Sequence, residues 1–148
     1  QTVLGDLWDE RRAAELALET ATAEATLDRN DGYAWFNMGS SLTLLGDYER
    51  AAVAYDRARV AGVPWRMTWY QFGPFEAYYG AGRYNEVLSL ASANLSNGGE
   101  YVEETHYWQG RALQALSRAN EAAGSYRAAL RYNPQYAAAR AALTELGL

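Results

Sequence analysis

The feature that most constrains this chain is a segment that returns 71 positions later. Residues 35–58 read WFNMGSSLTLLGDYERAAVAYDRA, and residues 106–129 read HYWQGRALQALSRANEAAGSYRAA. Small, aliphatic and aromatic residues recur in register: Gly39 and Gly110, Leu42 and Leu113, Ala51 and Ala122, Tyr55 and Tyr126, Ala58 and Ala129. A third copy lies between them, because Gly46-Asp47-Tyr48 recurs 36 positions later as Gly82-Arg83-Tyr84. Three successive units of about 35 residues predict a stack of repeated modules.

Each unit predicts two helices joined by a turn. In the first unit, apolar and small residues from Trp35 to Leu42 follow the i, i+3, i+4, i+7 spacing of an amphipathic helix. Gly46-Asp47 interrupts that pattern. A second stripe with helical spacing runs from Ala51 to Ala58 around Tyr55. The small residues allow two helix backbones to approach closely, and the tyrosine fills the space beside them.

The flanking segments extend the same all-helical scheme. Residues 6–29 are rich in alanine and predict one long helix against the first unit. Asn133-Pro134 ends the last unit, because a residue before proline avoids helical geometry. Residues 135–148 predict a capping helix that is polar on its outer side. The expected structure is a single domain over residues 1–148, with eight helices and no strands.

These repeats resemble the tetratricopeptide repeat, whose signature is W-x2-L-G-x2-Y, a later A-x3-F-x2-A and a closing proline. The first unit reads W-x2-M-G-x2-L with A-x3-Y-x2-A, and the third reads H-x2-Q-G-x2-L with A-x3-Y-x2-A and Pro134. The resemblance covers about residues 32–136. It implies a right-handed α-α superhelix of three hairpins, at residues 32–65, 66–99 and 100–134. The middle unit departs from the signature in its second helix, where Val87, Ala91 and Asn94 replace the expected alanine, aromatic and alanine residues.

The resemblance also implies a binding surface, since the first helix of each tetratricopeptide unit lines a concave groove. The family's groove positions correspond here to Tyr33, Phe36, Ser40 and Thr43, then Trp69, Phe72, Glu76 and Tyr79, then Glu104, Tyr107, Arg111 and Gln114. Two interpretations of the aromatic side chains stay open. The rings either pack in the core or form an exposed patch that binds a protein segment. In the second case Arg111 and Glu76 would orient the ligand through charge-assisted hydrogen bonds.

Other aromatic residues fall on the family's packing positions, and we expect them in the core: Trp35, Tyr55, Phe75, Tyr78 and Tyr126. One known type of ligand is not expected. Some tetratricopeptide domains hold the C-terminal carboxylate of heat-shock chaperones with Lys, Asn and Arg. Those positions here carry Phe36, Ser40, Gly73, Glu104 and Trp108, and Glu104 would repel a carboxylate.

Gly73-Pro74 interrupts the first helix of the middle unit. A proline inside a helix removes a backbone donor and crowds the carbonyl four residues earlier. We expect a kink or bulge that absorbs the surplus residues of this unit. The alternative interpretation is a functional kink that directs Trp69 and Phe72 toward a ligand.

Composition argues against several functional classes. A formal charge of −5 and a pI near 4.9 do not favour a nucleic-acid or anionic-lipid ligand. The chain has no cysteine and one histidine, His106, which stands where the first unit has a packing tryptophan. We therefore expect no catalytic residues, no metal site and no cofactor. No apolar stretch approaches the length of a membrane span. The missing initiator methionine suggests a piece of a longer protein, so localisation stays open.

Three hypotheses of function follow. The first is a non-catalytic scaffold that binds a peptide or protein segment in an aromatic concave groove. The second is an accessory arm that forms a homodimer or packs on another domain of its parent protein. The third comes from residues 62–84, which look like a stretch of bacterial tetratricopeptide regions that follow a papain-like cysteine peptidase domain. In that case catalysis would lie outside this sequence.

Overall fold

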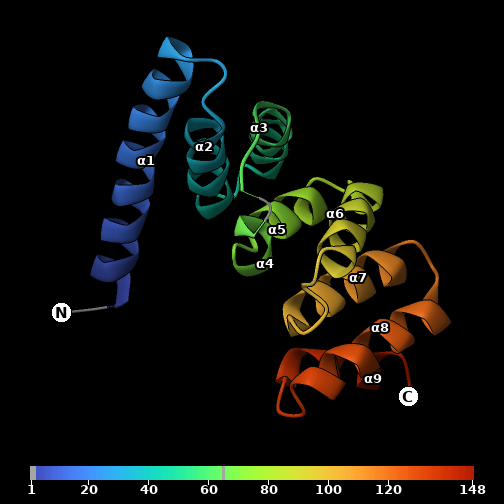
Figure 1. Cartoon of the computed structure of the whole chain (residues 1–148). Helices are drawn as coiled ribbons and strands as arrows, with labels where there is room; N and C mark the ends of the chain where they lie inside the picture. Colours follow the sequence, from blue (N-terminus) through green and yellow to red (C-terminus); the bar gives the residue numbers. More distant parts are fainter. Residues whose placement is uncertain (1–2, 65) are drawn as a thin grey trace. The chain divides into compact units, whose positions relative to one another are not determined.

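Every regular element in the described part of the chain is an α-helix. The computed structural model describes the backbone of residues 3–64 and 66–148, and the side chains of residues 9–64 and 66–148. No strand occurs within those ranges, which confirms the all-α class (Figure 1). They form nine helices where eight were expected, because the first helix of the middle unit is in two pieces. Trp65, at the boundary between the first two expected repeats, lies outside the described residues.

The chain divides into two compact units. Unit 1 comprises residues 1–64 and 76–81, and unit 2 comprises residues 65–75 and 82–148. The expectation of one continuous superhelix therefore stays a prediction, and each unit is described by itself.

Unit 1 is built on three consecutive helices: α1 (Val3–Leu27), α2 (Gly32–Leu44) and α3 (Tyr48–Ala61). α2 lies beside both α1 and α3 (Figure 1). The long alanine-rich helix runs to Leu27, two residues short of the expected end at residue 29. It buries Ala14, Ala21 and Ala25, whose spacing places them on one face. Asp31 caps the start of α2, and its carboxylate accepts hydrogen bonds from the backbone N–H groups of Tyr33 and Ala34.

The close approach of α2 and α3 depends on a missing side chain. A Cβ added at Gly39 would lie 2.8 Å from Cε1 of Tyr55, so any larger residue would push that ring away. Tyr55 is buried, and its hydroxyl lies 3.2 Å from that of Ser40. Phe36 packs edge-on against the Tyr55 ring, at 5.1 Å between centroids. The predicted pairing of a small residue with a buried tyrosine is confirmed here.

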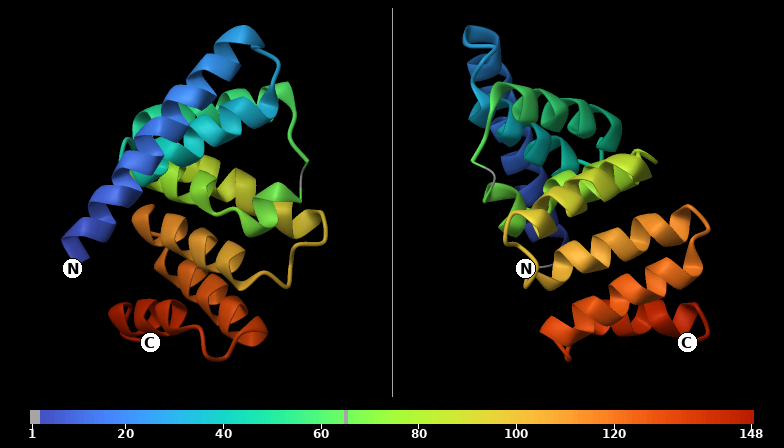
Figure 2. Two further views of the ribbon diagram at one scale, coloured as in Figure 1. Left: turned by 90° about the vertical axis from the view of Figure 1, so that its left-hand side faces the viewer. Right: turned by 45° about the vertical axis from the view of Figure 1, so that its right-hand side comes forward.

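Unit 2 contains α4 (Met67–Tyr70), α6 (Tyr84–Ser96), α7 (Glu103–Ala115), α8 (Ala119–Tyr132) and α9 (Ala137–Glu145). α7 lies against α6 and α8, and α8 against α9, as Figure 2 shows from two sides. Gly110 repeats the role of Gly39, since a Cβ there would lie 2.5 Å from Cε1 of Tyr126. The core between these helices joins Leu113 and Tyr126 to Ala139 and Ala142 of α9.

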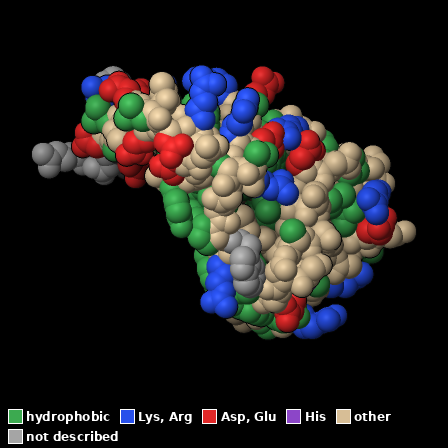
Figure 3. Space-filling model, turned by 45° about the horizontal axis from the view of Figure 1, so that its top comes forward, with side chains coloured by type: hydrophobic (Ala, Val, Ile, Leu, Met, Phe, Trp, Pro, Cys, Tyr) green, Lys and Arg blue, Asp and Glu red, His purple; other side chains and the backbone are tan. Residues whose placement is uncertain are grey.

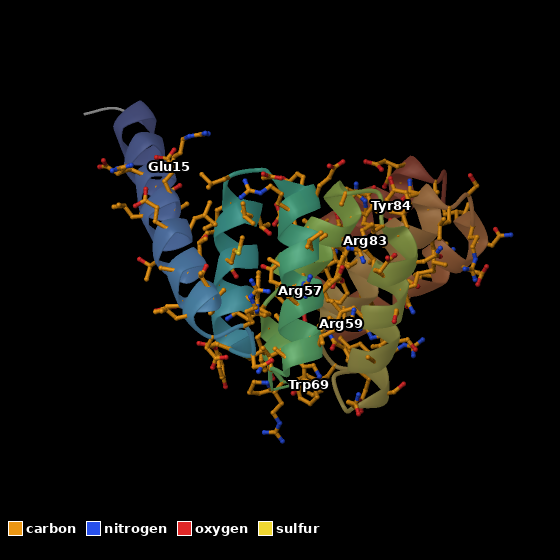
Figure 4. The ribbon with its side chains drawn as sticks, turned by 90° about the horizontal axis from the view of Figure 1, so that it is seen from above. Glu15, Arg57, Arg59, Trp69, Arg83 and Tyr84 are labelled. Carbon is orange, nitrogen blue, oxygen red and sulfur yellow. The ribbon has the colours of Figure 1, made fainter. Side chains whose placement is uncertain are left out.

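Three of the turns between consecutive helices share one backbone conformation. The turn residue has a positive φ each time, 79° at Gly46, 71° at Gly82 and 61° at Ser117. An ion pair between residues i and i+3 follows each turn. The acidic residue comes first in the first pair, and the arginine comes first in the other two. The pairs are Asp47–Arg50 at 3.2 Å, Arg83–Glu86 at 2.9 Å and Arg118–Glu121 at 2.6 Å; Arg83 is labelled in Figure 4. The repeated helix–turn–helix pattern is therefore local and regular.

The structure has no kink or bulge inside one helix at Gly73-Pro74, so that expectation is wrong. α4 ends at Tyr70, Gln71 is extended with φ −112° and ψ 102°, and a new helix, α5 (Gly73–Gly80), begins at Gly73. Pro74 thus stands in the first turn of α5. The backbone N–H that proline lacks would have no partner within the helix at that position, so the residue is well tolerated there.

Candidate ligand-binding face

A strip of partly exposed side chains runs along α7 in unit 2. Glu104, Tyr107, Arg111 and Gln114 are each partly exposed and follow helical spacing, so they share one face of the helix. These are the groove positions that the sequence predicts for the third repeat. We call them the α7 strip.

Within the strip, Tyr107 and Arg111 are joined. Nη1 of Arg111 donates a hydrogen bond to the hydroxyl of Tyr107 at 3.0 Å, which fixes both side chains one helical turn apart. Gln114 is tied to the core, since its Oε1 accepts a hydrogen bond of 2.7 Å from the Tyr126 hydroxyl. The strip is therefore ordered by its own contacts before any ligand arrives, which lowers the entropic cost of binding.

Tyr136 adds a ring to the strip from the start of α9. It caps α9 with φ −68° and ψ 92°, and its ring packs edge-on against Tyr107 at 5.5 Å. Burial raises the pKa of the Tyr136 phenol to about 12, and the negative charge of Glu104 adds to the rise. Sequence reasoning did not select Tyr136. Its place two residues after Pro134 predicted only the start of a capping helix.

The acidic end of the strip holds two neighbouring carboxylates. Glu103 accepts a hydrogen bond of 2.8 Å from Nδ2 of Asn133. Partial burial raises the pKa of the Glu104 carboxyl, and the charge of Glu103 raises it further. Among the described residues no Arg or His lies within ion-pair distance of Glu104.

The predicted residues of unit 1 divide between surface and core. Tyr33 is 53% exposed on α2, whereas Phe36 is 4% exposed and lies in the core against Tyr55. Ser40 is partly exposed but engaged with Tyr55 and with the carbonyl of Phe36. Of the two interpretations of the Phe36 ring, the packed one is correct. Thr43 is also buried, and it donates to the carbonyl of Gly39 at 2.8 Å.

Glu76 and Tyr79 also belong to unit 1, on α5. Glu76 is exposed, and its Oε1 lies 3.4 Å from the hydroxyl of Tyr48, while Tyr79 is partly exposed. Their neighbour Tyr78 is fully buried, as expected, and its hydroxyl donates to Oδ1 of Asp56 at 2.9 Å. The structure thus keeps Glu76 and Tyr79 accessible and confirms the packing role of Tyr78.

Trp69, expected to line the groove, is buried in unit 2. Only 6% of it is exposed, and it packs edge-on against Tyr70 and Tyr101. The segment is held by Thr68, whose hydroxyl donates to Oδ1 of Asn94 at 2.7 Å, and Asn94 returns a bond to the Thr68 carbonyl. Trp69, labelled in Figure 4, therefore anchors α4, whereas Phe72 beyond it is partly exposed.

Two tyrosines beside Trp69 are exposed, although neither was among the predicted groove residues. Tyr70 and Tyr101 are 60% and 49% exposed, and their hydroxyls lie 2.9 Å apart. Both rings pack edge-on against the buried Trp69. No periodic signal could have paired them, because one precedes the helix break at Gln71 and the other lies in the turn before α7.

Several cavities open on the units, two of them between helices. In unit 1 a space of about 800 Å³ lies between α1 and α2, beside Ala14, Ala17 and Leu44. In unit 2 a space of about 550 Å³ is lined by α6, α7 and α8, with Gln109 and Ser125 bonded to each other at 3.0 Å. Gly124 contributes no side chain to it, and a Cβ at that position would meet nothing within 4 Å. Neither cavity contains a residue of the α7 strip.

The contacts of His106 give it a structural role. Its Nε2 lies 2.7 Å from the carbonyl oxygen of Glu100, so this nitrogen carries the proton and donates. The ring also stacks on Tyr132 at 5.4 Å. In the described part of the chain no three His, Cys, Asp or Glu residues are grouped as metal ligands.

The charges on one face of the molecule are mixed, and the described helices are not of the membrane-spanning type. On the face shown in Figure 3, arginine and acidic side chains lie among one another. None of the described helices has both the length and the apolar composition needed to span a bilayer.

Comparison of the sequence with known protein-family models and with curated proteins finds no match.

Proposed function

We propose that this chain is a tetratricopeptide-type scaffold that binds a peptide or protein segment on the α7 strip. The observation that carries the proposal is the strip itself, in which ring area, a carboxylate and a guanidinium share one accessible helix face. Tyrosine and arginine contribute strongly to protein interfaces, because they bury much area at modest entropic cost. The recurring turns and the Gly39–Tyr55 and Gly110–Tyr126 contacts support the tetratricopeptide assignment.

A scaffold role also agrees with the chemistry of the strip. Its residues are held by hydrogen bonds to each other and to the core, and the strip has no nucleophile paired with a base. The proposed activity is therefore recognition without catalysis. The buried Phe36 and Trp69 do not contact the ligand in this proposal.

The absence of cysteine allows a direct test. Glu104→Cys places a single thiol on the strip, and Glu145→Cys places one on the exposed last turn of α9 as a matched control. Peptides selected from a random library on the wild-type chain are measured by fluorescence anisotropy. Coupling a bulky maleimide at position 104 should abolish binding of the selected peptides, and coupling at position 145 should leave it unchanged. Peptides that bind equally to both labelled proteins would reject the strip as the binding face.

The accessory-arm alternative has an observation of its own. α1 exposes Leu16 and Leu27, at 47% and 89%, and borders the 800 Å³ cavity together with the exposed Leu44 of α2. Apolar surface of this kind is often covered in an assembly. Sedimentation of the wild type and of Leu16→Glu tests whether the chain associates with itself through α1. A dimer that the glutamate dissociates favours the accessory arm, and a monomer in both cases rejects self-association through α1.

A further inference from the structure

We propose that Glu104, Tyr107 and Tyr136 form a subsite for a cationic side chain, a lysine or arginine of the bound segment. The inference rests on the proposed function, since it names the chemistry that one end of the α7 strip selects. It adds a specific ligand group and a register for the ligand on the helix.

The geometry of the subsite combines two rings with one carboxylate. Tyr107 and Tyr136 meet edge to face, at 5.5 Å between centroids and 79° between planes. Glu104 lies three residues before Tyr107, on the same face of α7. All three side chains are partly exposed. A cation placed beside aromatic rings and a carboxylate is attracted by both the ring quadrupoles and the negative charge.

Two carboxylates make the electrostatic surroundings negative at the Glu104 end of the strip. Burial raises the pKa values of both Glu104 and Tyr136, and Glu103 contributes in the same direction to each. The Glu103 carboxylate is already bonded to the Asn133 amide. Glu104 is hydrogen-bonded to its own backbone and has no ion-pair partner among the described side chains, so an arriving ammonium or guanidinium would supply an opposite charge.

Arg140 is directed away from the subsite, whereas the Arg111 guanidinium carbon lies 5.9 Å from the centroid of the Tyr107 ring. On α9, Nη2 of Arg140 donates to the carbonyl oxygen of Pro134 at 2.6 Å. Arg111 bonds the Tyr107 hydroxyl and lies seven residues beyond Glu104, about 10 Å of helix rise. The strip is therefore acidic at its Glu104 end and basic at its Arg111 end. An extended ligand rises about 3.3 Å per residue, so its basic residue should precede or follow an acidic one by about three positions.

The experiment uses the full chain and two small probes. The probes are N-acetyl-lysine N-methylamide and its neutral analogue N-acetyl-norleucine N-methylamide, titrated while the tyrosine ring signals are followed by NMR. The lysine probe should shift the Tyr107 and Tyr136 signals in a saturable way and bind about fivefold or more tightly than the neutral probe. Glu104→Gln should reduce its affinity to that of the neutral probe. The matched control Glu145→Gln should not change it.

The pH dependence gives a second readout. Binding requires the ionised Glu104 carboxylate, whose pKa in the free protein is raised by burial. Affinity for the lysine probe should therefore fall as the pH drops from about 7 through the raised pKa of the carboxyl, and the Glu104→Gln variant should lose this dependence. The other titratable or charged groups that face the site are Glu103, Tyr107, Tyr136 and Arg111.

Each outcome separates this inference from the function on which it rests. Equal binding of the two probes, or a lysine affinity that survives Glu104→Gln, overturns the subsite. Selected peptides that are blocked by the label at position 104 but show no basic residue leave the scaffold function intact and reject the subsite. A lysine probe that binds through Glu104 while no peptide binds the strip rejects the scaffold function alone. If Glu104→Gln does not fold, Glu104→Lys provides the same test by placing a cation in the subsite.

Discussion

His106 takes the place of Trp35 after 71 positions and makes the same hydrogen bond. The indole Nε1 of Trp35 donates to the carbonyl of Arg29 at 2.9 Å, and Nε2 of His106 donates to the carbonyl of Glu100 at 2.7 Å. The two acceptors are also 71 positions apart. In both hairpins a ring nitrogen on the first helix thus holds the segment that leads into that helix, although the residue type has changed.

This shared bond predicts similar losses of stability at two unlike residues. Trp35→Phe and His106→Phe each keep an aromatic ring but leave a backbone carbonyl without its donor. Each should lower the free energy of unfolding by about 1 kcal/mol in urea denaturation. Tyr33→Phe, at an exposed ring, is the control and should change little. A loss at Trp35 without one at His106 would show that the two hydrogen bonds are not equivalent.

Two glycines of unit 2 should respond in opposite directions to alanine. Gly110 faces the Tyr126 ring, with only 2.5 Å available to a Cβ, so Gly110→Ala should destabilise the fold by about 2 kcal/mol. At Gly124 a Cβ meets nothing within 4 Å, and the residue lies inside α8. Gly124→Ala should therefore stabilise by about 0.5–1 kcal/mol through helix propensity. Thermal unfolding of the two variants measures both effects, and changes of the same sign would contradict this packing.

The turn between α7 and α8 stores a strain that the turn before α6 avoids. Ser117 has φ 61°, a left-handed conformation that costs a residue with a Cβ, whereas Gly82 at φ 71° accepts it freely. Ser117→Gly should stabilise by about 0.5 kcal/mol, since the relief of strain is partly offset by the greater freedom of glycine when unfolded. Gly82→Ala should destabilise by about 1 kcal/mol. Urea midpoints of the two variants check the prediction, and a destabilised Ser117→Gly would reject it.

The parts of this structure that the sequence predicts well are those fixed by local chemistry. Gly39 and Gly110 mark close helix contacts because only glycine leaves room for the tyrosine ring beside them. Gly46 and Gly82 mark turns because glycine adopts a positive φ without strain. The helix composition and the packing role of Tyr55 follow from the same spacing rules.

The parts that could not be predicted depend on contacts between distant segments. The helix break at Gln71 changes which way every preceding side chain faces, so a groove register continued through it places Trp69 on the wrong side. Thr68 and Asn94 hold the resulting short helix, and their pairing across 26 residues leaves no periodic trace. Tyr136 reaches the α7 strip by the same kind of long-range contact.

The burial of Trp69 changes what its removal should do. A groove residue could be truncated with little loss of stability, but Trp69 fills the space beside Tyr101 and Gly99. Trp69→Ala should destabilise the chain by about 3–5 kcal/mol, as a large buried aromatic does elsewhere. Tyr70→Ala, at an exposed neighbouring ring, is the matched control and should cost much less. Equal losses in urea denaturation would mean that Trp69 is not an anchor.

Alkaline pH should weaken unit 1 through Tyr78. Burial raises the pKa of its phenol to about 12, and the acceptor carboxylate of Asp56 adds to the rise. Because the folded pKa lies above the ordinary value near 10, the neutral phenol contributes stability that is complete below about pH 10 and is lost as the pH rises through about 12.

Tyr78→Phe removes this titration together with the hydrogen bond to Asp56. The variant should therefore be less stable at pH 7 by about 1 kcal/mol, and its stability should fall less steeply between about pH 10 and 12. Urea denaturation across this range, with Tyr33→Phe as the control for an exposed tyrosine, measures both slopes. Identical slopes in the wild type and Tyr78→Phe would show that this phenol does not ionise on unfolding.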